Sequence, residues 1–61
     1  MRKIKVIRNH KGHFWDADAG QFREWLFATK YEINQDIDAD LKKAVDDNNA
    51  CEVVEFNIYS K

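Results

Sequence analysis

The segment RKIKVIR at residues 2–8 alternates basic and β-branched side chains with a period close to two. This pattern predicts a β-strand, because successive side chains of a strand point to opposite faces of a sheet. Ile4 and Val6 share one face, while Ile7 lies on the other face together with two lysines. The strand therefore needs apolar cover over Ile4 and Val6, which the rest of the chain has to supply.

The residues after this strand and those near the end of the chain predict two further strands. A turn is expected at residues 9–12, where Gly12 can adopt a positive φ, and residues 13–15 follow as a short strand. Residues 51–59 again alternate and are rich in β-branched and aromatic residues, so they predict the last strand. Its core-facing side chains are Val54, Phe56 and Ile58.

Residues 19–32 predict a first helix. Asp18 is suited to cap its N-terminus, and Gln21 stands three residues further on, as in a capping box. Phe22 and Leu26 fall one helical turn apart on the face that would cover the sheet.

A second helix is expected to end near Asn48, because Asn48 and Asn49 tolerate the left-handed conformation at a helix C-terminus. Its candidate N-terminal caps are Asn34, Asp36 and Asp38. No proline or glycine separates the two helices, so one continuous helix over residues 19–48 is the alternative. Two helices are favoured, because a rod of about 45 Å would overhang so small a sheet.

These elements give an α+β fold in the order ββααβ, with a three-stranded, mostly antiparallel sheet and two helices on one face. The last strand is expected to run antiparallel to the second strand and parallel to the first. Residues 1–61 are expected to form a single domain, because a second domain could not bury a core of its own. The expected core comprises Ile4, Val6, Phe14, Phe22, Leu26, Ile33, Ile37, Leu41, Val45, Val54, Phe56 and Ile58.

Composition is typical of a globular protein, since hydrophobic residues make up 44% of the chain. The single cysteine, Cys51, excludes an internal disulfide. No apolar run approaches the roughly 20 residues of a membrane-spanning helix, and the N-terminal residues do not have the pattern of a secretory signal. We therefore expect a cytoplasmic protein that does not associate with membranes.

Charge is segregated along the chain. Residues 1–13 carry five basic residues and no acidic one, whereas residues 14–61 carry five basic and eleven acidic residues. The candidate contacts for nucleic-acid phosphates are Lys3, Lys5, Arg8 and Lys11. The sequence pI of about 6.0 argues against this use. An acidic DNA mimic over residues 31–50 is weaker still, because pairs such as Asp38 with Lys42 relieve its charge.

Patterns typical of catalytic or metal-binding sites are incomplete in this sequence. The metal-like set is His10, His13, Asp16 and Cys51, which lacks the second close ligand pair of a structural zinc site. Residues 36–47 begin like an EF-hand loop, but Leu41 occupies the position of the required glycine. Cys51 has no identifiable general base. We therefore expect no metal, no cofactor and no enzymatic activity.

Apolar side chains exceed what the expected core can bury. Phe27 and Tyr31 lie off the inward face of the first helix, and Ile7, Val53 and Tyr59 lie on the sheet face without helices. Because exposed apolar clusters mark interfaces, these residues predict a non-enzymatic protein-binding module. Such a module would be a small regulator, inhibitor or adaptor that binds another protein or itself as a homodimer. By analogy, we expect a phage or mobile-element product acting on a host protein. A small nucleic-acid-binding protein that uses the basic N-terminal strand is the alternative.

Overall fold

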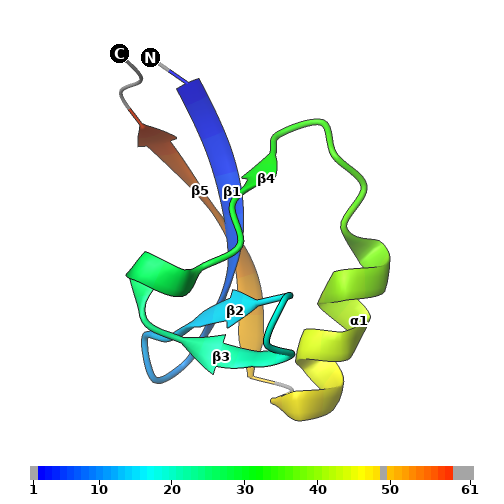
Figure 1. The fold of residues 1–61 in the computed structure, drawn as a ribbon. Coiled ribbons are helices and arrows are strands. Elements are labelled where there is room, and N and C mark those ends of the chain that lie inside the picture. The colour runs from blue at the N-terminus through cyan, green and yellow to red at the C-terminus, as the bar shows by residue number, and fades with distance from the viewer. Residues whose placement is uncertain (1, 49, 59–61) are drawn as a thin grey trace.

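The computed structural model describes residues 2–48 and 50–58, which form five strands, one α-helix and one 3-10 turn (Figure 1). In chain order these elements are β1 (Arg2–Asn9), β2 (Phe14–Asp16), β3 (Gln21–Arg23), the 3-10 turn η1 (Trp25–Phe27), β4 (Tyr31–Glu32), α1 (Asp38–Asp47) and β5 (Cys51–Ile58). All strand pairs among them are antiparallel. The α+β class is confirmed, whereas the predicted three-stranded sheet with two helices is not matched.

Strand β1 lies at the centre of the sheet. One of its edges pairs with β5 over the whole length, from Arg2 opposite Ile58 to Asn9 opposite Cys51. The other edge pairs with β2 near one end and with β4 around Lys5, and β3 extends the sheet beyond β2. The prediction that the last strand runs antiparallel to the second strand and parallel to the first is therefore wrong.

The sequence of β1 explains this central position. Its fully buried apolar side chains are Ile4, Val6 and Ile7, which together occupy both faces of the strand. Its basic side chains complement β5, because Arg8 forms an ion pair with Glu52 at 3.1 Å and Lys5 lies directly opposite Glu55. Opposite charges that face each other across a strand pair stabilise that pairing.

Residues 19–32 do not form the predicted helix. Gly20 adopts a φ of +67° in the connection between β2 and β3, and its amide donates to the carbonyl of Asp16 at 2.8 Å. Phe22 then pairs opposite Trp15 across β2 and β3. The segment is rich in aromatic residues, which suit strands better than helices. The same geometry excludes the continuous helix over residues 19–48.

The second predicted helix is confirmed as α1. Asp36 Oδ1 accepts a hydrogen bond from the amide of Asp38 at 3.0 Å in the turn that leads into the helix. The N-cap residue is Ile37, which makes no side-chain cap, so the prediction of Asn34, Asp36 or Asp38 as N-cap is wrong. Asn48 follows the helix with a φ of −150°, which is extended backbone, so the left-handed conformation is wrong for Asn48, and Asn49 lies outside the described residues. Across residues 2–48 and 50–58, no helix has the length and apolar content needed to cross a membrane.

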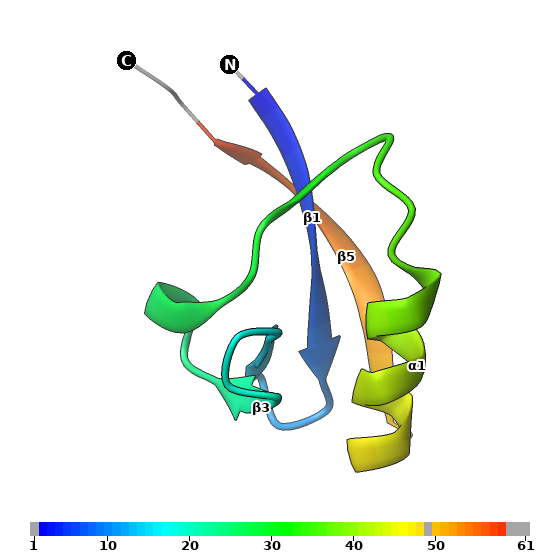
Figure 2. The same cartoon turned by 45° about the vertical axis from the view of Figure 1, so that its right-hand side comes forward.

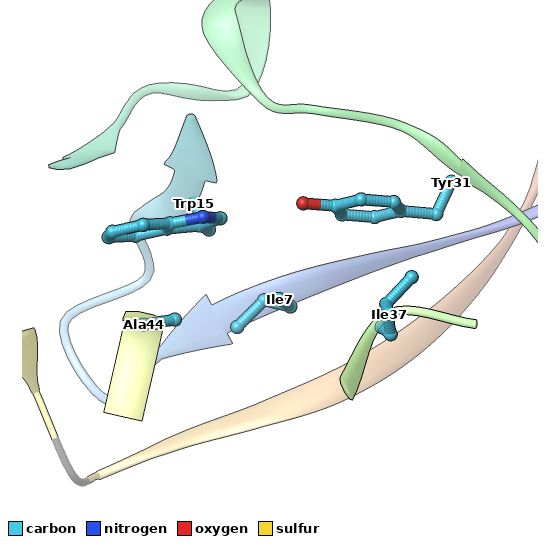
Figure 3. Close-up of a cluster of buried hydrophobic side chains, with 5 residues drawn as sticks. All are labelled: Ile7, Trp15, Tyr31, Ile37 and Ala44. Carbon is cyan, nitrogen blue, oxygen red and sulfur yellow. The ribbon is translucent and has the colours of Figure 1, made fainter. Parts of the chain in front are cut away.

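The main core lies between the sheet and α1, as Figure 3 shows. Its buried side chains are Ile7, Trp15, Tyr31, Ile37 and Ala44, with Phe22, Leu41 and Cys51 packed around them. In Figure 3, Trp15 and Tyr31 approach each other on one side of Ile7, while Ala44 and Ile37 come from α1 and the residue before it. The helix therefore covers the sheet face that the sequence pattern had left open.

The opposite sheet face is covered near the 3-10 turn. Ile4 and Val6 point to this face, because they alternate with Ile7 along β1. The Trp25 ring lies here in edge-to-face contacts, with its centroid 5.1 Å from that of Phe14 and 5.2 Å from that of Phe56. Figure 2 places the turn and α1 on opposite sides of the ribbon formed by β1 and β5.

The predicted core is therefore correct in part. Ile4, Val6 and Ile37 are buried, and Phe14, Phe22, Ile33, Leu41, Val54, Phe56 and Ile58 are half-buried. Leu26 and Val45 are exposed, so their assignment to the core is wrong. Among the buried apolar residues, the pattern missed Ile7, Trp15, Ala28 and Tyr31.

Candidate functional site

Three consecutive apolar side chains, Trp25, Leu26 and Phe27, lie exposed on η1; we call them the apolar turn. Their exposed fractions are 38%, 79% and 42%. The backbone is extended on both sides of this single 3-10 turn, and the amide of Phe27 donates to the carbonyl of Glu24 at 2.9 Å. So short a turn has no buried face of its own, and all three side chains remain accessible.

The apolar turn is held in place from beneath and from its C-terminal side. Trp25 is anchored by its edge-to-face contacts with Phe14 and Phe56. Beyond the turn, the Thr29 amide donates to the carbonyl of Trp15 at 3.0 Å, and Thr29 Oγ1 accepts from the Ala17 amide at 2.8 Å. These bonds tie the segment to β2 and the residue after it, so a partner would meet a preorganised surface.

Two cations flank the apolar turn. The Arg23 guanidinium carbon lies 3.8 Å from the centroid of the Phe27 ring, and Lys30 Nζ lies 4.9 Å from the centroid of the Trp25 ring. Arg23 also forms an ion pair with Asp16, in which Nη1 of Arg23 lies 3.6 Å from Oδ2 of Asp16. Leu26 lies between Trp25 and Phe27 in the sequence. It is the most exposed of the large apolar residues that the structure describes.

The structure does not bring the five predicted interface residues together. Phe27 is exposed on the apolar turn, and Val53 is 41% exposed on β5. Ile7 and Tyr31 are buried in the core under α1, so the prediction that they are exposed is wrong. Tyr59 lies outside the described residues. Phe27 and Val53 also belong to different surfaces, because Val53 lies opposite Ile7 on the sheet face toward α1.

The sequence pattern missed Trp25 and Leu26 as surface residues, although it contained a usable signal. Consecutive residues on a helix are about 100° apart, so three consecutive bulky apolar residues cannot all face one core. On the predicted helix, the segment WLF at residues 25–27 would therefore expose at least one large side chain.

Tyr31 has a structural role in the core. Its hydroxyl donates to Asp40 Oδ2 at 2.8 Å, which joins β4 to α1. Burial, together with this hydrogen bond to Asp40, raises the pKa of the Tyr31 hydroxyl well above its ordinary value. A phenol that holds its proton so firmly serves as a hydrogen-bond donor.

The basic residues of β1 are partly neutralised within the chain. Arg2 is paired with Glu32, and Arg8 is paired with Glu52. The other predicted phosphate contacts are Lys3 and Lys11, which are exposed, and Lys5, which is half-buried opposite Glu55. The strand therefore presents fewer unpaired cations than its sequence indicates.

The metal-like residues do not converge. Within residues 2–48 and 50–58, no group of three or more His, Cys, Asp or Glu side chains is placed to hold a metal ion. His10 and Cys51 line a hollow of about 370 Å³ at the end of β1 and β5. Burial raises the pKa of the Cys51 thiol, which disfavours the nucleophilic thiolate.

These features make the apolar turn the strongest candidate for a functional surface. It combines a large exposed aliphatic side chain, two aromatic rings and a fixed backbone. No protein-family model, curated protein or solved structure matches this chain.

Proposed function

We propose that this chain is a non-enzymatic protein-binding module whose contact surface is the apolar turn. One observation carries the proposal, namely that Trp25, Leu26 and Phe27 are consecutive and all exposed. Contiguous apolar surface of this kind marks interaction sites in small proteins. Tryptophan is among the residues most often found at energetic centres of interfaces.

The energetics fit a module whose main task is to present this turn. Moving the Leu26 side chain from water into a partner's pocket would contribute about 1.5–3 kcal/mol. The hydrogen bonds around Thr29 already order the segment, so little additional conformational entropy is lost on binding. The partner is a protein with an apolar pocket, which fits a small regulator, inhibitor or adaptor.

The proposal is tested by comparing three forms of the immobilised chain in extracts of its native cell. Leu26→Asp should lose the proteins that the wild type captures, because it places a charge at the tip of the turn. Val45→Asp is the matched control, since Val45 is an exposed apolar residue on α1, on the other side of the molecule. If Leu26→Asp and the wild type capture the same proteins in equal amounts, the apolar turn is not the contact surface.

The alternative, a nucleic-acid-binding protein, has weaker support. It rests on Lys3 and Lys11, which are exposed, while Arg2 and Arg8 are engaged in ion pairs. Phosphate contacts are strongest at low salt, so binding of a mixed oligonucleotide at about 50 mM salt is the decisive condition. This alternative would be favoured if the chain binds the oligonucleotide at that salt concentration and the binding weakens steeply with added salt. The double substitution Lys3→Glu with Lys11→Glu should then abolish the binding.

A further inference from the structure

Strand β5 has an open edge. Its eight residues, Cys51–Ile58, pair with β1 along one edge, and no strand among residues 2–48 and 50–58 pairs with the other. An open edge presents a row of unpaired amides and carbonyls, which can bind the edge of another strand. Figure 1 shows β5 running alongside β1, the strand with which it pairs.

Strand β5 lacks most of the devices that usually block edge-to-edge pairing. The strand contains no proline and no lysine, and its unbroken register with β1 leaves no bulge. Its two acidic residues, Glu52 and Glu55, lie opposite Arg8 and Lys5 of β1. Glu52 forms its ion pair with Arg8 at 3.1 Å, whereas Glu55 forms no ion pair among the described residues, so the Glu55 charge discriminates between pairing registers. Val53 is 41% exposed, although it pairs with a buried residue of β1.

We propose that β5 pairs antiparallel with β5 of a second copy of this chain, about a two-fold axis through Val54. A two-fold axis normal to the sheet keeps each face on its own side, so only residues of the same face lie opposite each other. Centring the pairing on Val54 uses residues 51–57, and it sets Glu52 opposite Phe56 and Val53 opposite Glu55. No two like charges are then directly opposed.

Neighbouring registers are less favourable. Centring on Glu55 sets this carboxylate against its own symmetry mate, and like charges directly opposite are destabilising. Centring on Val53 leaves only residues 51–55 paired within β5. The register through Val54 also continues an apolar row across the sheet, because Val54 lies opposite Val6 within each chain. The net charge of −1 opposes self-association only weakly.

This pairing has a consequence that depends on the proposed function. The apolar turn contacts the sheet face that carries Phe14 and Phe56, and the two-fold axis maps that face onto itself. A dimer would therefore present two apolar turns on one face and both α1 helices on the other. Two copies of one binding surface would raise the apparent affinity for a repeated or dimeric target.

The register is tested with two variants that differ only in the sign of one charge. In sedimentation velocity over a range of protein concentrations, the wild type should change from monomer to dimer. Because residue 53 of each copy lies opposite Glu55 of the other, Val53→Glu creates two pairs of like charges in the dimer. Val53→Lys creates two pairs of opposite charges at the same positions. The dissociation constant of Val53→Glu should exceed that of Val53→Lys by about tenfold. A monomer at every concentration, or equal constants for the two variants, would overturn the proposal.

Disulfide formation gives a second measurement that does not depend on these charges. In a Cys51→Ser background, Val54→Cys should form a disulfide-linked dimer under mild oxidation, because directly opposed residues lie within disulfide range. Asn57→Cys is the control, since its symmetry mate would lie about 20 Å away along the strand. Preferential cross-linking at position 57 would overturn the register.

A last variant separates this proposal from the function of the apolar turn. Leu26→Asp should dimerise with the same dissociation constant as the wild type, even where it loses capture of a foreign partner. If Leu26→Asp abolishes the dimer, the copies associate through the apolar turn, and the pairing of β5 is wrong. Circular dichroism of each variant verifies that the fold is retained.

Discussion

Tyr31 couples the stability of the fold to pH. Its hydroxyl is buried and donates to Asp40, and both features raise its pKa. The folded chain therefore keeps this proton at a pH where the unfolded chain, with a tyrosine pKa near 10, loses it. Because the folded state binds more protons, the free energy of unfolding should fall above about pH 10, by up to about 1.4 kcal/mol per pH unit.

Urea unfolding between neutral and alkaline pH tests this coupling. A Cys51→Ala background removes the thiol, whose raised pKa acts in the same direction. In that background Tyr31→Phe should lose about 1 kcal/mol at neutral pH, because it removes the hydrogen bond to Asp40. Its stability should then fall less steeply at alkaline pH than that of the parent. An identical alkaline slope in both proteins would show that Tyr31 is not responsible.

Leu26 and Ile7 have environments opposite to those that their sequence pattern predicts. Leu26 is 79% exposed, so Leu26→Asp should change the free energy of unfolding by less than about 0.5 kcal/mol. Ile7 is fully buried, so Ile7→Asp should cost about 3 kcal/mol or more, because it places a charge in the core. Thermal unfolding of the two variants measures both changes in stability. Loss of the cooperative transition in Leu26→Asp would place this residue in the core.

Among the structural elements, the connection between β2 and β3 depends on Gly20. Its φ of +67° is strained for residues with a side chain, although an added Cβ would meet no atom within 4 Å. Gly20→Ala should therefore lose about 1 kcal/mol of stability from backbone strain alone. Gly20→Asn should lose less, because asparagine tolerates this conformation better. Equal stability of Gly20→Ala and the wild type in urea would contradict this account.

The sequence was sufficient to predict β1, α1 and β5, because each has a sustained period of apolar residues. Residues 19–32 were misassigned for a physical reason. Phe22 and Leu26 fall at helical spacing by coincidence, while β2 supplies a tertiary partner that holds Gln21–Arg23 as a strand. Periodicity within a segment carries no information about such pairing partners.

At the scale of the whole molecule, strand order explains which surfaces the sequence analysis misplaced. A pattern of alternation shows that Ile7 and Ile4 have opposite faces, but it does not show which face receives the helix. Because α1 covers the sheet face of Ile7, both Ile7 and Tyr31 are buried. The apolar turn lies on the other side of the sheet and remains exposed. The exposure of Phe27 was predicted from the excess of aromatic residues, whereas the exposure of its neighbours Trp25 and Leu26 was not predicted.

The central claim is that a partner protein contacts the apolar turn, and photo-crosslinking from within the turn tests it most directly. A photoreactive amino acid replaces Leu26 in one form of the chain and Val45 in a control form, since both positions are exposed. Each form is irradiated in an extract of the native cell. We predict a covalent adduct with a defined protein from position 26, lost on competition with excess wild-type chain, and none from position 45. No adduct from position 26, or the same adducts from both positions, would contradict the claim.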